Sequence, residues 1–77
     1  MRIIDEDNEN LINSVMILLT PNEAHELIDA LESIDATKGD HIHINDVDFS
    51  RQITVLIYTP ENLQFFNEKV RQAVDQS

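Results

Sequence analysis

Two histidines are the residues of this 77-residue chain whose spacing most directly suggests chemistry. His41 and His43 alternate with Ile42 and Ile44, so a strand would place both imidazoles on one face, within reach of a shared metal ion. A zinc site needs three or four protein ligands, and the residues that could add one are Asp40, Asp46 and His25. No motif ties these residues together. The pattern therefore favours a polar strand face, and a metal-binding protein that uses His41 and His43 remains an alternative.

Other catalytic groups are sparse. The chain has no cysteine, which excludes disulfides, thiolate metal sites and cysteine nucleophiles. A single glycine cannot form a glycine-rich phosphate loop. The serines are distant along the chain from the histidines, and Thr20 and Thr59 each precede a proline, as helix caps do. We therefore expect a protein that is not an enzyme and that uses no cofactor or bound metal.

Acidic residues recur along one predicted helix. They are spaced three apart, with no Lys or Arg within a turn to pair with: Glu23, Glu26, Asp29 and Glu32. Like charges at this spacing cost about 0.2–0.5 kcal/mol for each pair. Such a face either keeps a small protein soluble or docks a basic protein. We predict that these four residues bind a basic protein partner, together with the acidic arm at the N-terminus.

The overall charge points to the same class of partner. Fifteen acids against five bases give a net charge of -10, which argues against nucleic acid and anionic membranes. Residues 1–48 hold twelve of the acids and only two bases, whereas residues 49–77 hold three of each. Any charged partner should therefore be basic and should contact the first two-thirds of the chain.

The length and hydropathy of the chain predict one globular domain. No apolar run approaches the ~20 residues of a membrane span, and the N-terminus turns acidic where a signal peptide would stay apolar. We expect a cytoplasmic protein with an acidic arm or short edge strand over residues 1–10. A single α+β domain should occupy residues 11–77.

The strands of that domain follow from the apolar pattern. The longest β-branched run predicts a central strand over residues 52–58, because a strand that is apolar on both faces belongs inside a sheet. Residues 41–46 alternate as a half-buried strand does, and the intervening residues suit a hairpin connection. Residues 11–19, L-I-N-S-V-M-I-L-L, predict a further strand.

Two helices are predicted after Thr-Pro steps. Thr20, Pro21 and Glu23 have the pattern of a capping box with proline in the first helical position, which predicts a helix over residues 21–35. Thr59 and Pro60 predict a second helix over residues 60–74.

The order β-α-β-β-α predicts a two-layer α+β sandwich. The sheet would be mainly antiparallel, with the central strand between the other two and both helices on one face. The expected core is Ile53, Val55, Ile57, Leu27, Leu31, Phe66 and Val70. The uncovered sheet face would carry Leu56, Tyr58 and His43, and exposed apolar patches usually mark an interface. We therefore also predict a homodimer through these three residues, tightening as salt is raised.

Three segments of residues 19–70 resemble a known group of proteins. They are L-T-P-x-E-A-x-x-L-I-x-x-L, H-I-H-I and I-T-V-x-I-Y-T-P-E-N-L. Together they look like small acidic bacterial proteins, some of which are grouped with immunity proteins of toxin systems. The resemblance implies a cognate toxin that is neutralised by binding, and it carries no site residue onto this chain.

Overall fold

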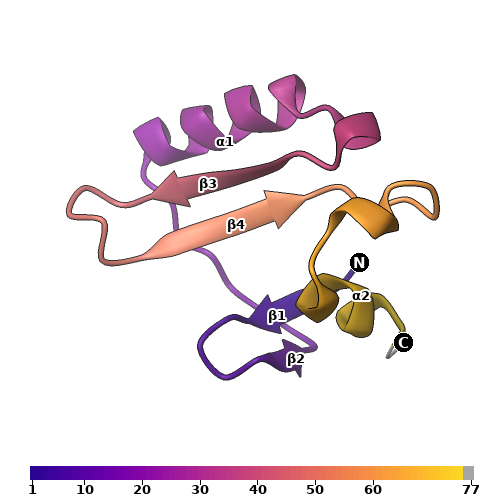
Figure 1. The fold of residues 1–77 in the computed structure, drawn as a ribbon. Helices are drawn as coiled ribbons and strands as arrows, with labels where there is room; N and C mark the ends of the chain where they lie inside the picture. Colours follow the sequence, from indigo (N-terminus) through magenta and orange to yellow (C-terminus); the bar gives the residue numbers. More distant parts are fainter. Residues whose placement is uncertain (76–77) are drawn as a thin grey trace.

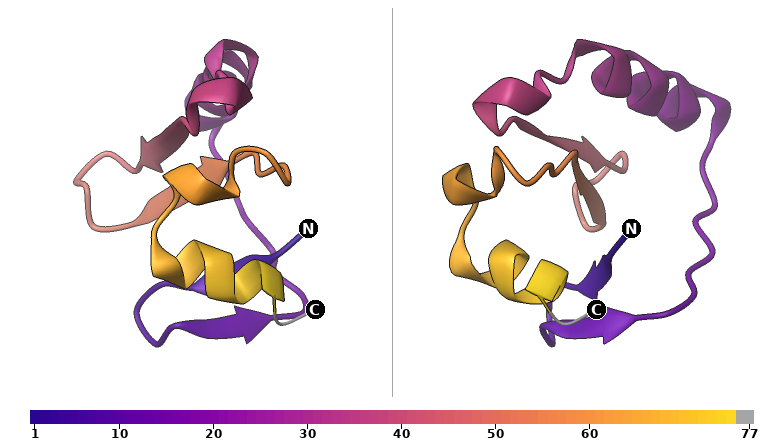
Figure 2. Two further views of the ribbon diagram at one scale, coloured as in Figure 1. Left: turned by 45° about the vertical axis from the view of Figure 1, so that its right-hand side comes forward. Right: turned by 90° about the vertical axis from the view of Figure 1, so that its right-hand side faces the viewer.

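The computed structural model describes residues 1–75 as three layers (Figures 1 and 2). A helix lies on one side of a two-stranded sheet, and a second two-stranded sheet with a short helix lies on the other side. The elements in chain order are β1 (Ile3–Asp5), β2 (Asn10–Ile12), α1 (Pro21–Ser33), the 3-10 turn η1 (Ala36–Lys38), β3 (His41–Asn45), β4 (Gln52–Leu56), the 3-10 turn η2 (Leu63–Phe65) and α2 (Glu68–Asp75).

The helix α1 begins where its sequence predicts. The Thr20 hydroxyl accepts from the Glu23 N–H at 3.2 Å, and the Glu23 carboxylate accepts from the Thr20 N–H at 2.9 Å, which completes the capping box. The helix ends at Ser33, slightly before the predicted end. Gly39 then turns the chain into β3 with a left-handed backbone, φ 69°.

The predicted hairpin is present and antiparallel. Its register pairs His43 with Thr54 and Ile44 with Ile53. Ile44 is buried, while His41 and His43 are exposed, as the alternation predicts. The half-buried side of α1, which includes Ala24 and Leu27, contacts β3.

The N-terminal hairpin joins the C-terminal helix. β1 and β2 pair antiparallel, with Ile3 opposite Ile12. The Arg2 guanidinium donates to the Ala73 and Val74 carbonyl oxygens at 3.1 and 3.2 Å, and so satisfies two carbonyls that the last turn of α2 leaves open. Residues at opposite ends of the sequence thus form one end of the molecule (Figure 1).

The single three-stranded sheet predicted from sequence is wrong. The four strands form two separate hairpins, and α2 lies near β1–β2 while α1 contacts β3, so the helices do not share a sheet face. Of the predicted strand over residues 11–19, only the first two residues lie in β2. The rest runs extended to α1 without a strand partner, because Leu11 and Ile12 are committed to pairing with β1.

The predicted second helix is also wrong over its first half. Asn62 is 2% exposed, and its side chain accepts from the Thr59 N–H at 2.8 Å and donates to the Ile57 and Ala36 carbonyls. The Asn62 N–H also donates to the Thr59 hydroxyl at 3.1 Å, so the predicted cap at Thr59 is present. The Asn62 amide, however, holds this segment against the turn after α1, and only the 3-10 turn η2 follows. α2 starts later, where the Asn67 side chain accepts from the Val70 N–H at 3.1 Å.

The core is smaller than the apolar pattern predicts. Phe66 is buried as expected, together with Ile44 and Ala73, which were not in the expected core. Ile53, Val55, Leu27 and Val70 are half-buried. Ile57 and Leu31 are 40% and 41% exposed, so their placement in the core was wrong. Ile57 lies just past the end of β4, and the third strand predicted beside β4 is absent from the described chain.

Candidate functional site

The outer face of α1 is the most strongly charged surface of regular structure. Glu26, Asp29 and Glu32 are all exposed, whereas Ala24 and Leu27 on the opposite side are half-buried. Positions three apart on a helix are surface neighbours, so these three carboxylates form one stripe. We call the residues Glu26, Asp29 and Glu32 the acidic face.

Glu23 does not belong to this stripe. It is half-buried, and its carboxylate is engaged by the Thr20 N–H at the start of the helix. The capping-box pattern already contained this information, because the box requires the third helical side chain to reach back. Of the four acids predicted to bind a partner, the structure brings three together as an outward stripe and directs the fourth to the cap.

The acidic face is not neutralised within the part of the chain that the structure describes. The ion pairs there join Lys38 to Asp35 (3.8 Å), Arg51 to Asp46 (3.4 Å), and Lys69 to Glu9 (3.8 Å). None involves a residue of the acidic face. Three of the five basic side chains thus pair with acids outside α1, and the helix keeps its charge.

A polar chain crosses from the β3–β4 sheet to the N-terminal hairpin. The His43 Nδ1 lies 2.9 Å from the Thr54 hydroxyl oxygen, and that hydroxyl lies 3.3 Å from a carboxylate oxygen of Glu6. A hydroxyl nucleophile needs a base that a third group orients. Here the carboxylate contacts the hydroxyl and not the imidazole, and both His43 and Glu6 are exposed. The geometry ties two layers together and does not form a catalytic triad.

The two histidines do not gather further metal ligands. Their rings meet edge to face with centroids 4.9 Å apart. Within residues 1–75, no group of three or more His, Asp or Glu side chains could hold a metal ion. Asp40, one of the candidate third ligands, instead accepts from the Asp35 N–H at 3.1 Å.

The residues predicted to form a dimer interface are unequally exposed. His43 is exposed, whereas Leu56 and Tyr58 are half-buried. The sheet face that carries His43 and Thr54 points toward the N-terminal hairpin, as the contact of Thr54 with Glu6 shows. This face is therefore partly covered within the chain.

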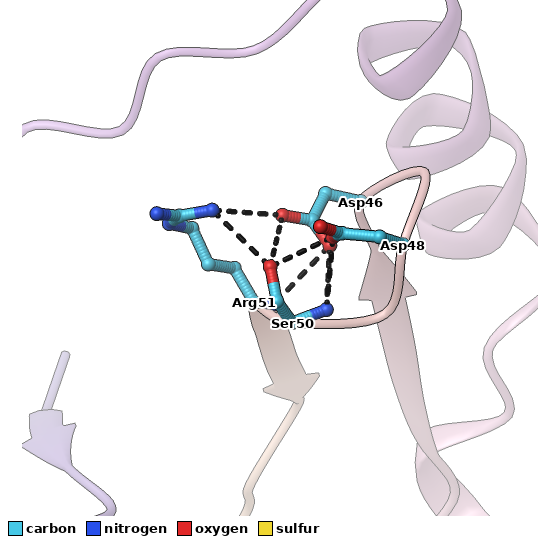
Figure 3. Close-up of polar contacts among 4 residues, drawn as sticks. All are labelled: Asp46, Asp48, Ser50 and Arg51. Carbon is cyan, nitrogen blue, oxygen red and sulfur yellow. Dashed lines mark hydrogen bonds and ion pairs between the residues drawn. The ribbon is translucent and has the colours of Figure 1, made fainter.

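The loop between β3 and β4, predicted only as a hairpin connection, contains a network of side-chain hydrogen bonds. Asp46 accepts from the backbone N–H groups of Ser50 (2.9 Å) and Arg51 (3.1 Å), and its carboxylate lies 3.2 Å from the Ser50 hydroxyl oxygen (Figure 3). Asp48 accepts from the same hydroxyl at 2.7 Å. The backbone hydrogen bond from Arg51 is the main reason that the pKa of Asp46 lies below its ordinary value, with Asp48, Arg51 and Ser50 side chains contributing.

This loop holds two apolar side chains in water. Val47 is 97% exposed and Phe49 is 76% exposed. Phe49 has a φ of 59°, a left-handed conformation that is strained for an aromatic residue and persists where surrounding contacts enforce it. The Asp-x-Asp-x-Ser spacing was the available sequence signal, because short polar side chains at such spacing cap turns.

No helix within the described residues is long and apolar enough to cross a membrane. Comparison with known proteins adds no assignment: no protein family, no curated protein and no solved structure matches the chain significantly.

Proposed function

We propose that this protein is a non-enzymatic interaction module that binds a basic protein partner through the acidic face of α1. The observation that carries the proposal is the stripe of three exposed carboxylates that has no ion-pairing cation within residues 1–75. A site that is complementary in charge accelerates encounter with a basic partner and selects against acidic ones.

The arrangement of the stripe has an energetic cost in the free protein. Glu26 and Asp29, and Asp29 and Glu32, are like-charged neighbours, at about 0.2–0.5 kcal/mol each. The helix dipole would offset that cost only within the first turn, and the acidic face lies beyond it. A basic partner would relieve the repulsion. The form of this function that the resemblance to immunity proteins implies is the neutralisation of a basic toxin.

The test is a charge-matched capture experiment from extract of the source cell. One bait carries Glu26→Gln, Asp29→Asn and Glu32→Gln. The control bait carries Glu61→Gln, Glu68→Gln and Asp75→Asn, the three acids of the last third of the chain, so that both change the net charge equally. The wild type and the control should retain a basic protein at low salt, and the helix variant should not. Equal retention by the two variants would show that net charge alone, and not this face, is responsible.

A further inference from the structure

The extended stretch between β2 and α1 has exposed apolar side chains and a backbone without hydrogen-bond partners in the described chain. We call residues 14–19 the apolar linker. Its side chains alternate in exposure, with Val15 and Ile17 each 51% exposed and Met16 and Leu18 83% and 82% exposed. This period of two is typical of a strand. Its backbone makes no hydrogen bond to any other part of residues 1–75.

A second unsatisfied edge lies along β4. Bonded and non-bonded pairs alternate in an antiparallel ladder, and the Asp46 N–H donates to the Arg51 carbonyl at 3.1 Å in continuation of the β3–β4 register. Ile53 and Val55 therefore point their backbone groups at β3. The residues that point theirs away are Gln52, Thr54 and Leu56, and no strand pairs with β4 on that side within the described chain, where Glu6 contacts only the Thr54 side chain.

Both unsatisfied stretches lack the features that normally protect a free strand edge. Exposed edges usually carry charges or bulges that prevent pairing with another chain. Residues 10–22 and residues 52–60 contain no charged side chain, in a protein whose net charge is -10. A charged partner has nothing to recognise there, whereas a second copy of this chain would not be repelled there.

The chain exposes more surface than a compact monomer of its mass. The chain exposes 6086 Å², whereas a compact monomer of 8.9 kDa exposes about 4,800 Å². The excess, about 1,300 Å², is more than the ~800 Å² that each partner buries in a standard interface. A two-stranded hairpin is also marginal by itself, and a third strand is the usual remedy.

We propose that the apolar linker of one copy adds as a third strand to the free edge of β4 in a second copy, reciprocally, in a twofold homodimer. Within one copy the linker does not pair with β4; its ends are held at Ile12 by the β1–β2 ladder and at Thr20 by the helix cap. The right-hand view of Figure 2 shows the linker apart from β3 and β4. This interface differs from the sheet face of Leu56, Tyr58 and His43, and it leaves the acidic face free.

Sedimentation of paired variants tests the proposal. Thr54→Pro removes an outward N–H without touching the β3 ladder, and Thr54→Val loses the same hydroxyl contacts but keeps that N–H. The wild type and Thr54→Val should be dimers at high micromolar concentration. Thr54→Pro, and the linker variant Met16→Glu/Leu18→Glu, should be folded monomers by circular dichroism. A monomeric wild type, or a Thr54→Pro protein that dimerises like Thr54→Val, overturns the proposal.

Mixing the two monomeric variants separates reciprocal exchange from other dimers. The linker variant keeps an intact β4 edge and the Thr54→Pro variant keeps an intact linker, so the mixture should form a heterodimer with one of the two contacts. Pairing of linker with linker would instead let Thr54→Pro dimerise alone. In the wild type, the Thr54 and Leu56 amides should exchange with solvent more slowly as protein concentration rises. Protection that does not change with concentration would mean that the edge is covered within one chain, and would reject the second copy.

Discussion

Asn62 is the side chain whose loss should damage the fold most for its size. It is 2% exposed, its amide donates to the Ala36 carbonyl at 2.6 Å and the Ile57 carbonyl at 2.9 Å, and its oxygen accepts from the Thr59 N–H at 2.8 Å. These three bonds join the turn after α1 to the end of β4. Asn62→Ala removes the partner of the Thr59 N–H and of the Ile57 carbonyl, and removes one of the two donors to the Ala36 carbonyl, which keeps the Gly39 N–H at 3.2 Å.

The expected magnitude follows from those bonds. A hydrogen bond contributes a net ~0.5–1.5 kcal/mol, so the three together are worth about 1.5–4.5 kcal/mol. The whole domain should have a free energy of unfolding of about 4–12 kcal/mol at its length. Asn62→Ala should therefore remove a large fraction of the stability. Denaturant unfolding followed by circular dichroism measures the loss, and no Trp is needed for it.

Two further variants sharpen the experiment. Asn22→Ala removes an exposed amide that makes no side-chain hydrogen bond within residues 1–75, and should change stability by less than ~0.5 kcal/mol. Asn62→Asp places a carboxylate against two carbonyl oxygens. It should be at least as destabilising as Asn62→Ala at neutral pH and should recover, relative to Asn62→Ala, as acid protonates it. If Asn62→Ala unfolds with the stability of Asn22→Ala, the reasoning about this junction is refuted.

Three other perturbations have defined outcomes. Gly39→Ala should cost about 1–3 kcal/mol in denaturant unfolding, because φ is 69° and an added Cβ would lie 2.7 Å from the Phe65 Cβ; no loss would mean that this contact relaxes freely. Thr20→Ala should cost about 0.5–2 kcal/mol in the same assay, whereas Glu23→Gln, which can still accept the Thr20 N–H, should cost less. The pKa of Asp46 is lowered chiefly by the Arg51 backbone hydrogen bond, so the ionised carboxylate stabilises the fold fully above its ordinary pKa and loses that effect as pH falls through the lowered pKa. Over that pH range the melting temperature of Asp46→Asn should therefore fall less than that of the wild type. Equal falls would contradict this role for Asp46.

The elements that sequence predicted well are those whose signals are local. The capping box at Thr20 places the start of α1, and alternation at His41–Asn45 gives a strand with Ile44 inside and the histidines outside. In both cases the residues that carry the signal also make the contacts. The outward direction of the acidic face follows equally from helical periodicity.

The elements that sequence predicted poorly depend on competition between partners. Residues 11–19 have a strand pattern, but β1 captures the first two and leaves the others unpaired. Residues 60–67 have a helical apolar pattern and a cap at Thr59, but the Asn62 amide bonds the Ala36 and Ile57 carbonyls and holds the segment in a turn. Neither the unpaired linker nor the turn at Asn62 can be predicted from helix or strand propensity or from apolar spacing, because each depends on hydrogen bonds to residues distant in the sequence.

The charged segments of this chain have hydrogen-bonded backbones, whereas its unpaired backbone groups lie in uncharged segments. Acids are concentrated on α1 and in the loops, where the helix or the Asp46 network bonds the backbone. Residues 10–22 and 52–60 are uncharged, and they contain the unpaired apolar linker and the open edge of β4. The two surfaces should therefore respond oppositely to ionic strength. Salt screens the attraction of a basic partner to the acidic face, and it equally screens the repulsion between two copies at -10 each, within about 8 Å at physiological ionic strength. Raising salt should release the partner while tightening the homodimer, so a single salt series distinguishes binding at the helix from pairing at the strands.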